Sequence, residues 1–178
     1  MTAITGSPSF EMALQESETL MLALESQSLT PQTLESQIAA LVRTENGARG
    51  FLVTYLTADS PNGDRLSPEI LNALAQSPEI IGELLVKNLA MSAAMAVFHS
   101  RRLDEVAAQS SRQVCRRSQT LIEALKLSCL PTKLEALRQT LVTGQGDYQN
   151  FLERWHYDSE QKQAILAVLA TLNPPDPH

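Results

Sequence analysis

Hydrophobic residues along most of the chain recur at steps of three and four, the spacing that places side chains on one side of an α-helix. The longest such run extends from Ser77 to Leu127. It opens with Ser77, Pro78 and Glu79, which supply an N-cap hydroxyl, a proline suited to the first helical position and an acid near the positive end of the helix dipole. This pattern predicts a long helical segment around which the other elements pack.

The two halves of the central segment differ in how far hydrophobicity extends around the helix. Residues 80–98 are apolar around most of the circumference, which predicts a helix buried on several sides. Residues 103–125 carry a single apolar stripe, typical of a surface helix with one buried face. One rod of roughly 50 residues would be about 75 Å long, whereas a compact domain of this length has a radius of gyration of about 16 Å. We therefore expect a break near Ser100 or at residues 109–111; the alternative is a protruding helix that pairs with a second copy.

Shorter helices are predicted on both sides of the central segment. Each starts at a capping residue, often followed by proline, and ends at glycine, proline or a polar turn. The expected ranges are about 9–26, 30–43, 67–76, 131–143, 146–157 and 158–172. The last three form a compact three-helix unit at residues 130–172.

Residues 45–57 are the most ambiguous part of the pattern. Residues 45–50 interrupt it with two glycines, and the β-branched and aromatic residues of 51–57 are typical of a strand. The same residues also form a helical face, and the sequence offers no second strand to pair with an isolated one. We predict a helix at 51–57. The polar Asn46 and Arg49 are either a buried anchor or a binding edge, and both interpretations stay open.

These elements predict an all-α, single-domain bundle of about seven or eight helices over residues 1–178, with loose ends at 1–8 and 174–178. The composition agrees with a folded helical protein. Hydrophobic residues make up 43% of the chain and there are only 7 glycines, unlike a disordered segment.

The sequence predicts a cytoplasmic protein without a transmembrane segment. The N-terminus lacks the basic and apolar regions of a secretory signal. The longest apolar run, Leu89 to Phe98, is much shorter than the roughly 20 residues that span a bilayer, and charged residues flank it. Cys115 and Cys129 form no CxxC pair, which indicates ordinary reduced thiols.

Charge is distributed unevenly along the chain. Residues 1–80 hold ten acids and three bases, whereas residues 81–178 hold ten acids and eleven bases. Such an acidic chain is a poor candidate for nucleic-acid binding, which needs clustered lysine and arginine. Five arginines form the only cationic concentration in the sequence: Arg101, Arg102, Arg112, Arg116 and Arg117. They make either a solvated helix face, partly paired with Asp104 and Glu105, or a docking face for an acidic partner or for the acidic half of a second copy.

No pattern in the sequence indicates a catalytic residue, a metal ligand or a cofactor-binding motif, and we expect a non-enzymatic protein without a cofactor. His99 and Cys115 are sixteen residues apart, too far to meet on one helix, although a hairpin break between them would let them meet. A thiol-dependent enzyme would need an exposed Cys115 whose pKa the neighbouring arginines lower. An ordinary buried thiol is the plainer interpretation.

The interior offers one further candidate site. Met91, Met95 and Phe98, beside several alanines, could line a pocket for an apolar ligand or a pigment, with His99 at its mouth. The plainer interpretation is that small residues beside methionines let buried helices approach closely.

Two stretches carry a resemblance to a known family: residues 45–57, ENGARGFLVTYLT, and residues 84–97, LLVKNLAMSAAMAV. They resemble an uncharacterised protein family from cyanobacteria, and the likeness runs through most of the chain. The resemblance includes no catalytic motif. It implies the cytosol of a photosynthetic bacterium and leaves the activity open.

Two functions from different classes follow from these observations. The first is an interaction, assembly or regulatory protein that acts through exposed helix faces, with a homodimer along residues 103–125 as one form. The alternative is a carrier or sensor with an apolar pocket around residues 91–99. The first predicts self-association or an exposed apolar patch, and the second predicts an enclosed void.

Overall fold

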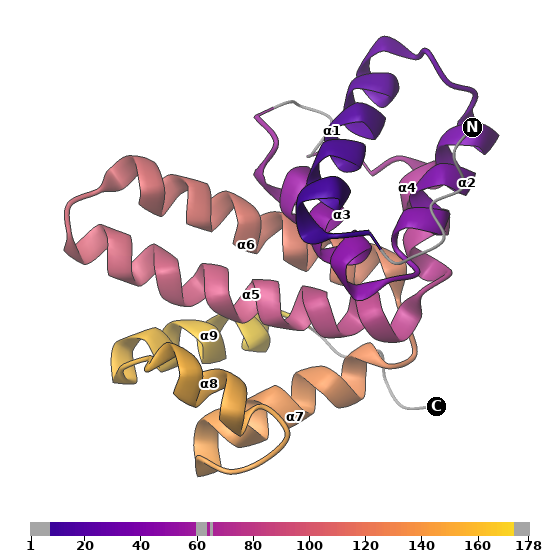
Figure 1. The fold of residues 1–178 in the computed structure, drawn as a ribbon. Helices are drawn as coiled ribbons and strands as arrows, with labels where there is room; N and C mark the ends of the chain where they lie inside the picture. The colour runs from indigo at the N-terminus through magenta and orange to yellow at the C-terminus, as the bar shows by residue number, and fades with distance from the viewer. Residues whose placement is uncertain (1–7, 60–63, 65, 173–178) are drawn as a thin grey trace. The chain divides into compact units, whose positions relative to one another are not determined.

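The computed structural model describes residues 8–59, 64 and 66–172, and α-helices are the only regular elements of this part (Figure 1). Nine helices follow one another there: α1 (Phe10–Ser26), α2 (Pro31–Leu41), α3 (Glu45–Thr57), α4 (Pro68–Ala75), α5 (Pro78–Arg101), α6 (Glu105–Leu125), α7 (Leu130–Thr143), α8 (Gln149–Trp155) and α9 (Ser159–Thr171). The all-α prediction is confirmed, with slightly more helices than expected. The predicted loose ends lie outside the described residues except for Pro8.

The start signals in the sequence act as helix caps in the structure. The side chains of Ser9, Thr30 and Ser67 each accept a hydrogen bond from the backbone N–H three residues later, and Pro31 and Pro68 begin α2 and α4. These local contacts explain why the helix starts were predictable from the sequence.

The segment predicted to interrupt the helical pattern is instead the first half of α3, which begins at Glu45 behind the N-cap Thr44. Its glycines serve close packing. A β-carbon on Gly47 would lie 1.9 Å from the carbonyl oxygen of Leu41, and one on Gly50 would lie 2.7 Å from the β-carbon of Ala13. The backbones therefore approach where glycine alone fits. The prediction of a helix at 51–57 is confirmed.

Asn46 and Arg49 have different roles. The Asn46 Nδ2 donates a hydrogen bond of 3.2 Å to the carbonyl oxygen of Pro8, just before α1. Arg49 is exposed, and its guanidinium carbon lies 5.2 Å from the centre of the Phe10 ring. Asn46 is thus an anchor for the chain entering α1, and Arg49 covers an aromatic ring.

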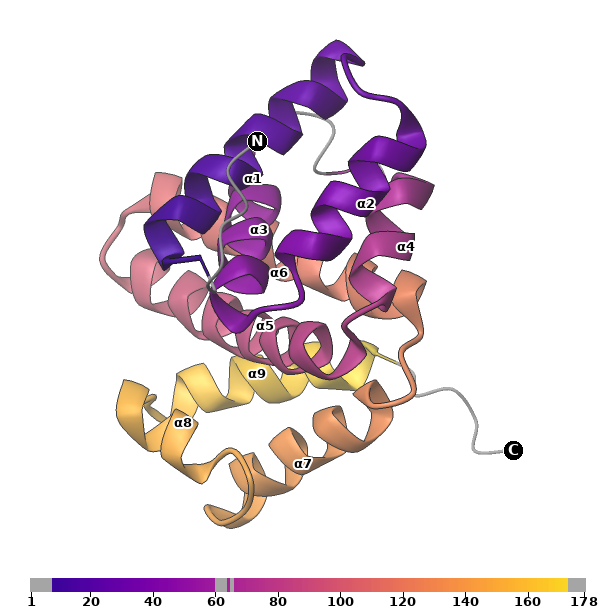
Figure 2. The same ribbon diagram turned by 45° about the vertical axis from the view of Figure 1, so that its right-hand side comes forward.

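The chain divides into two compact units, Met1–Leu84 and Leu85–His178, and the division falls within α5. In the first unit α1 packs against α3 and α2 packs against α4 (Figure 2). The core of this unit is apolar, and its largest fully buried side chains include Phe51, Leu52, Tyr55 and Leu74. The prediction of a single domain over residues 1–178 stays a prediction.

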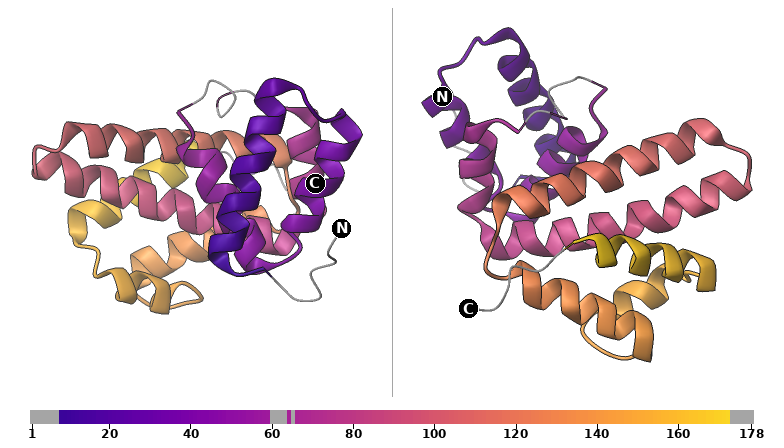
Figure 3. Two further views of the ribbon diagram at one scale, coloured as in Figure 1. Left: turned by 45° about the horizontal axis from the view of Figure 1, so that its top comes forward. Right: turned by 180° about the vertical axis from the view of Figure 1, so that it is seen from behind.

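The second unit contains the helical hairpin formed by the rest of α5 and by α6, together with α7, α8 and α9. The predicted break of the central segment near Ser100 is confirmed, because residues 102–104 separate α5 from α6 (Figure 3). The alternative break at residues 109–111 lies inside α6. α7 ends as predicted at Gly144, which has a φ of 76°. The N-cap of α9 is Asp158, whose side chain forms the predicted capping box with Gln161.

α5 is long and apolar enough by length and composition to cross a membrane, and half of its most apolar window is buried inside the protein. The core helix of a soluble protein meets the same criterion. The absence of a transmembrane segment therefore stays a prediction.

Candidate interaction surface

The turn between α5 and α6 carries an exposed apolar cluster, which we call the hairpin end and define as Phe98, Arg102, Leu103 and Val106. The exposed fractions are 40% for Phe98, 92% for Leu103 and 82% for Val106. The guanidinium carbon of Arg102 lies 5.4 Å from the centre of the Phe98 ring, within cation–π distance. Leu103 and Val106 were predicted on the buried stripe of the surface helix. That prediction is wrong, because Leu103 lies in the turn and Val106 in the first turn of α6, where both are exposed.

The backbone of the turn holds Leu103 in an uncommon conformation. Its φ is 58°, in the left-handed region, which costs a residue with a side chain roughly 1–2 kcal/mol. The carbonyl oxygen of His99 accepts hydrogen bonds of 3.1 Å from the backbone N–H groups of Arg102 and Asp104. The Asp104 carboxylate in turn accepts a 3.0 Å hydrogen bond from the N–H of Ala107 and caps α6. These bonds define the turn that presents the leucine to solvent.

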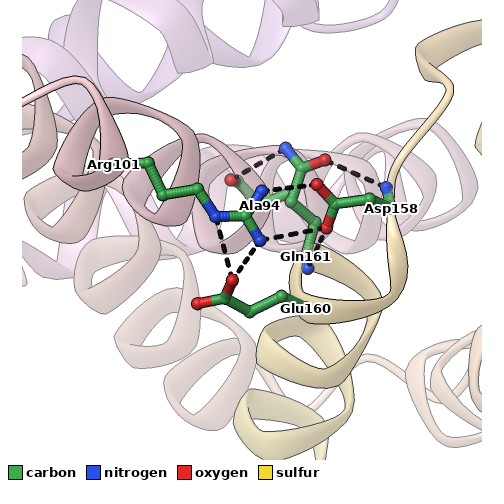
Figure 4. A network of polar contacts seen from close by, with 5 residues as sticks. All are labelled: Ala94, Arg101, Asp158, Glu160 and Gln161. Carbon is green, nitrogen blue, oxygen red and sulfur yellow. Dashed lines mark hydrogen bonds and ion pairs between the residues drawn. The ribbon is translucent and has the colours of Figure 1, made fainter.

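Arg101 lies next to the hairpin end but is bound to the start of α9 (Figure 4). Its guanidinium contacts the Asp158 carboxylate at 2.5 Å and also pairs with Glu160, to which Nε donates at 2.9 Å. Pairing with Asp104 or Glu105 was one interpretation of the sequence, and Arg101 instead pairs with Asp158 and Glu160. The hydrogen bonds from Arg101 and from the backbone of Gln161 lower the pKa of Asp158 to about 2.

A second contact joins α9 to α5 beside this ion pair. Gln161 is buried, and its Nε2 donates a hydrogen bond of 3.2 Å to the carbonyl oxygen of Ala94 (Figure 4). Its Oε1 accepts from the backbone N–H of Asp158 at 3.1 Å. One side chain therefore completes the cap of α9 and fastens that helix to α5.

The other predicted docking arginines occupy three different environments. Arg112 pairs with Glu105 at 2.6 Å. Arg116 is exposed, and its guanidinium has no hydrogen-bond or ion-pair partner among the described residues. Arg117 is only 4% exposed, so the prediction of an exposed arginine face is wrong there. It lies four positions before the buried Leu121 and therefore shares its side of α6.

A groove of about 240 Å³ is lined by residues of α5, α6 and α9. We call it the α6–α9 groove. It is lined by Ala93, Ala96, Val97, Arg112, Cys115, Arg116, Gln119, Ala164 and Val168. Small side chains on α5 and α9 leave the space, and the two arginines stand along its α6 side. The sequence analysis missed this site, although Arg112, Arg116 and Gln119 are spaced as one helical stripe.

Cys115 lacks the exposure that a thiol-dependent enzyme would require. It is 8% exposed, and burial raises the pKa of its thiol, against the opposing effect of a hydrogen bond with Ser92. The lowered pKa that a thiol-dependent enzyme would need is therefore not found, and the plainer interpretation of Cys115 as a buried thiol is confirmed. Desolvation disfavours the thiolate more than the surroundings stabilise it.

The candidate pocket residues of α5 do not line the α6–α9 groove. Met91, Met95 and His99 are half-buried and Phe98 is exposed, and none of the four lines the α6–α9 groove. A second cavity, of about 390 Å³, lies among α7, α8 and α9 and is lined by other residues, including Thr140, Gln149 and Lys162. The carrier hypothesis around Met91 and His99 stays a prediction.

Among the described residues, no group of three histidine, cysteine, aspartate or glutamate side chains is placed to hold a metal ion. In the same part of the chain, the Tyr157 hydroxyl is a buried polar atom without a hydrogen-bond partner. Burial raises the pKa of this phenol. Neither observation indicates a reaction.

The described residues form an all-α helical bundle with exposed apolar side chains at the hairpin end. The model of the family described as "uncharacterised conserved protein UCP020893" matches residues 9–172, so the chain belongs to this family. The resemblance to an uncharacterised family is thereby confirmed. No curated protein and no solved structure matches the chain.

Proposed function

We propose that this protein is a non-enzymatic interaction or assembly protein that binds a protein partner through the hairpin end. The observation that carries this proposal is the exposure of Phe98, Leu103 and Val106 beside the exposed Arg102. Burying an aliphatic side chain of this size contributes about 1.5–3 kcal/mol. A partner that covered the cluster would gain from each of these side chains.

The composition of the hairpin end suits a binding surface. Aromatic residues and arginine are enriched where binding energy concentrates in protein interfaces, and here Arg102 lies over the ring of Phe98. Leu103 adds an almost fully exposed aliphatic side chain, at a positive φ that glycine would adopt without strain. A strained backbone and an exposed apolar side chain at the same residue favour a functional role for Leu103.

A crosslinking experiment tests the proposal. A photoreactive residue at position 103 or 106, introduced in cells that make the protein, should yield the same protein adduct at both positions. Val142 on α7 is 65% exposed and supplies the matched control position. The partner thus identified should bind purified Leu103→Asp about tenfold more weakly or worse, while Val142→Asp binds normally. Adducts that are equal at 103 and 142, or binding unaffected by Leu103→Asp, would overturn the proposal.

We also propose that the protein works in the cytoplasm of a cyanobacterium and binds no nucleic acid. The resemblance of residues 45–57 and 84–97 to a cyanobacterial family supports the first part, and the acidic charge of −6 supports the second. Fractionation of a cyanobacterium that encodes a family member should place the protein with the cytoplasm. Recovery with the membranes would contradict the proposal.

A further inference from the structure

The size and openness of the α6–α9 groove favour a side chain of a partner helix as its occupant. Enclosed small-molecule sites usually have volumes of about 300–1,000 Å³, whereas this groove measures about 240 Å³. Ala93, Ala96 and Val97 line it from α5, and Ala164 and Val168 line it from α9. Amphipathic helices commonly bind in such apolar grooves through one or two anchors.

The charge along the groove favours an acidic helix. Arg112 is held by Glu105 and also donates to the Ser100 hydroxyl at 2.9 Å. Arg116 is exposed and has no partner among the described residues. A carboxylate beside an apolar anchor would therefore meet an arginine that is available for pairing.

One helix of this chain has the complementary surface. α1 contains four glutamates and no lysine or arginine. Leu22, on its outer side, is 64% exposed. Glu18 precedes this leucine by four residues and Glu25 follows it by three, so all three side chains lie on one face of the helix. The most exposed apolar residue of α1 is thus flanked by acids.

The hairpin end, a second exposed apolar feature, fits the groove less well. The hairpin end carries Arg102 beside Leu103 and Val106. Placing it in the groove would bring that arginine toward Arg112 and Arg116, and like charges at an interface are unfavourable. Charge therefore favours α1 over the hairpin end as the complement of the groove.

We infer that α1 of a second copy docks in the α6–α9 groove, with Leu22 inserted against the alanines and Glu18 or Glu25 paired with Arg116. This inference rests on the proposed function, because self-assembly is one form of an interaction protein, but it uses a surface other than the hairpin end. The two contacting patches differ, so the contact is heterologous. Assemblies then grow by head-to-tail addition unless a ring closes.

Light scattering behind size exclusion tests the inference on the purified full chain. The mass should rise above the 19.5 kDa monomer with concentration, and high salt should weaken the association. Leu22→Asp should weaken it by about tenfold or more. Val142→Asp, at a site of nearly equal exposure, is the matched control and should leave the mass unchanged. Circular dichroism confirms that each exposed-site variant is folded.

A charge exchange tests the contact itself. Arg116→Glu should weaken the association, as should the paired change Glu18→Arg with Glu25→Arg, and combining all three changes should restore it. The exposed Arg154→Glu is the control for the first change. A monomer at every concentration, an association insensitive to Leu22→Asp, or a combination that restores nothing would each overturn the inference. None of these results affects the crosslinks of the hairpin end, so the failure of one proposal is distinguishable from the failure of the other.

Discussion

The two units of the chain reach stability by different means. In Met1–Leu84 the buried side chains are almost all apolar, and glycines allow α1 and α3 to approach closely. In Leu85–His178 polar side chains are buried as well, namely Ser92, Arg117, Ser118, Thr140 and Gln161. The first unit depends mainly on shape, and the second depends also on hydrogen bonds and charge. Substitutions should therefore act through volume in one unit and through polar contacts in the other.

The largest effect is expected for Gly50→Ala in the first unit. The added β-carbon would lie 2.7 Å from the β-carbon of Ala13 and 2.8 Å from its carbonyl carbon. Because backbone atoms cannot step aside, α1 and α3 must separate, at a cost of about 1–3 kcal/mol. Urea unfolding followed by circular dichroism measures the change.

The comparison variant in the second unit is Gly144→Ala. Nothing lies within 4 Å of the new β-carbon, and the φ of 76° supplies the whole penalty, about 1 kcal/mol. If Gly50→Ala and Gly144→Ala lowered the free energy of unfolding by the same amount, close packing would not distinguish the first unit from the second.

Gln161→Ala is the corresponding change to a polar contact in the second unit. It removes the hydrogen bond to the Ala94 carbonyl and half of the capping box of α9. The expected loss is about 1–2 kcal/mol. The single tryptophan, Trp155, lies in this unit, so its fluorescence during urea unfolding follows the effect directly. The exposed Gln163→Ala, two positions along α9, is the control and should leave the unfolding midpoint nearly unchanged.

Tyr157→Phe should stabilise the second unit slightly. The hydroxyl is buried without a hydrogen-bond partner among the described residues, and removing an unsatisfied polar group avoids a cost of about 1 kcal/mol. Thermal unfolding should shift upward. Tyr157→Leu, which also loses the ring contact with Phe151 at 6.4 Å, should shift it downward. A downward shift for Tyr157→Phe would show that the hydroxyl is stabilising.

The smallest effect concerns the ion pair between Arg101 and Asp158. The pKa of Asp158 is lowered from its ordinary 3.8 to about 2, first by Arg101 and then by the backbone of Gln161. The stabilisation from this carboxylate is therefore complete above pH 3.8 and is lost as the pH falls toward 2. In Arg101→Met the pKa should rise toward 3.8, which carboxyl NMR measures. An unchanged pKa would show that the exposed pair is screened by solvent.

The local rules of the sequence predicted most of the helix boundaries. The capping residues Ser9, Thr30 and Ser67, the glycine at 144 and the capping box at Asp158 all act through neighbours within a few positions. The break near Ser100 was foreseen because an unbroken rod exceeds the size of a domain. Capping contacts of this kind join residues that are close in the sequence, so they do not depend on which elements pack around them.

Residues whose environment depends on distant neighbours were predicted less well. Gly47 and Gly50 were taken as an interruption, because the sequence does not show that Leu41 and Ala13 lie against them. Leu103 and Val106 were placed on a buried stripe, which is valid only if the helix continues past the turn. The α6–α9 groove joins three helices distant along the chain, and no local pattern indicates that they meet.

The amino-acid sequence by itself determined that the chain is helical, where most of the helices begin and how unevenly charge is divided. Helix formation and capping depend on hydrogen bonds within a turn or two, so local sequence is sufficient for them. Only the tertiary structure decided the environments of the five arginines. Arg101 and Arg112 are ion-paired, Arg102 lies over the Phe98 ring, Arg116 lines the α6–α9 groove and Arg117 is buried. Burial and pairing depend on which helices meet, and that is a property of the packed chain.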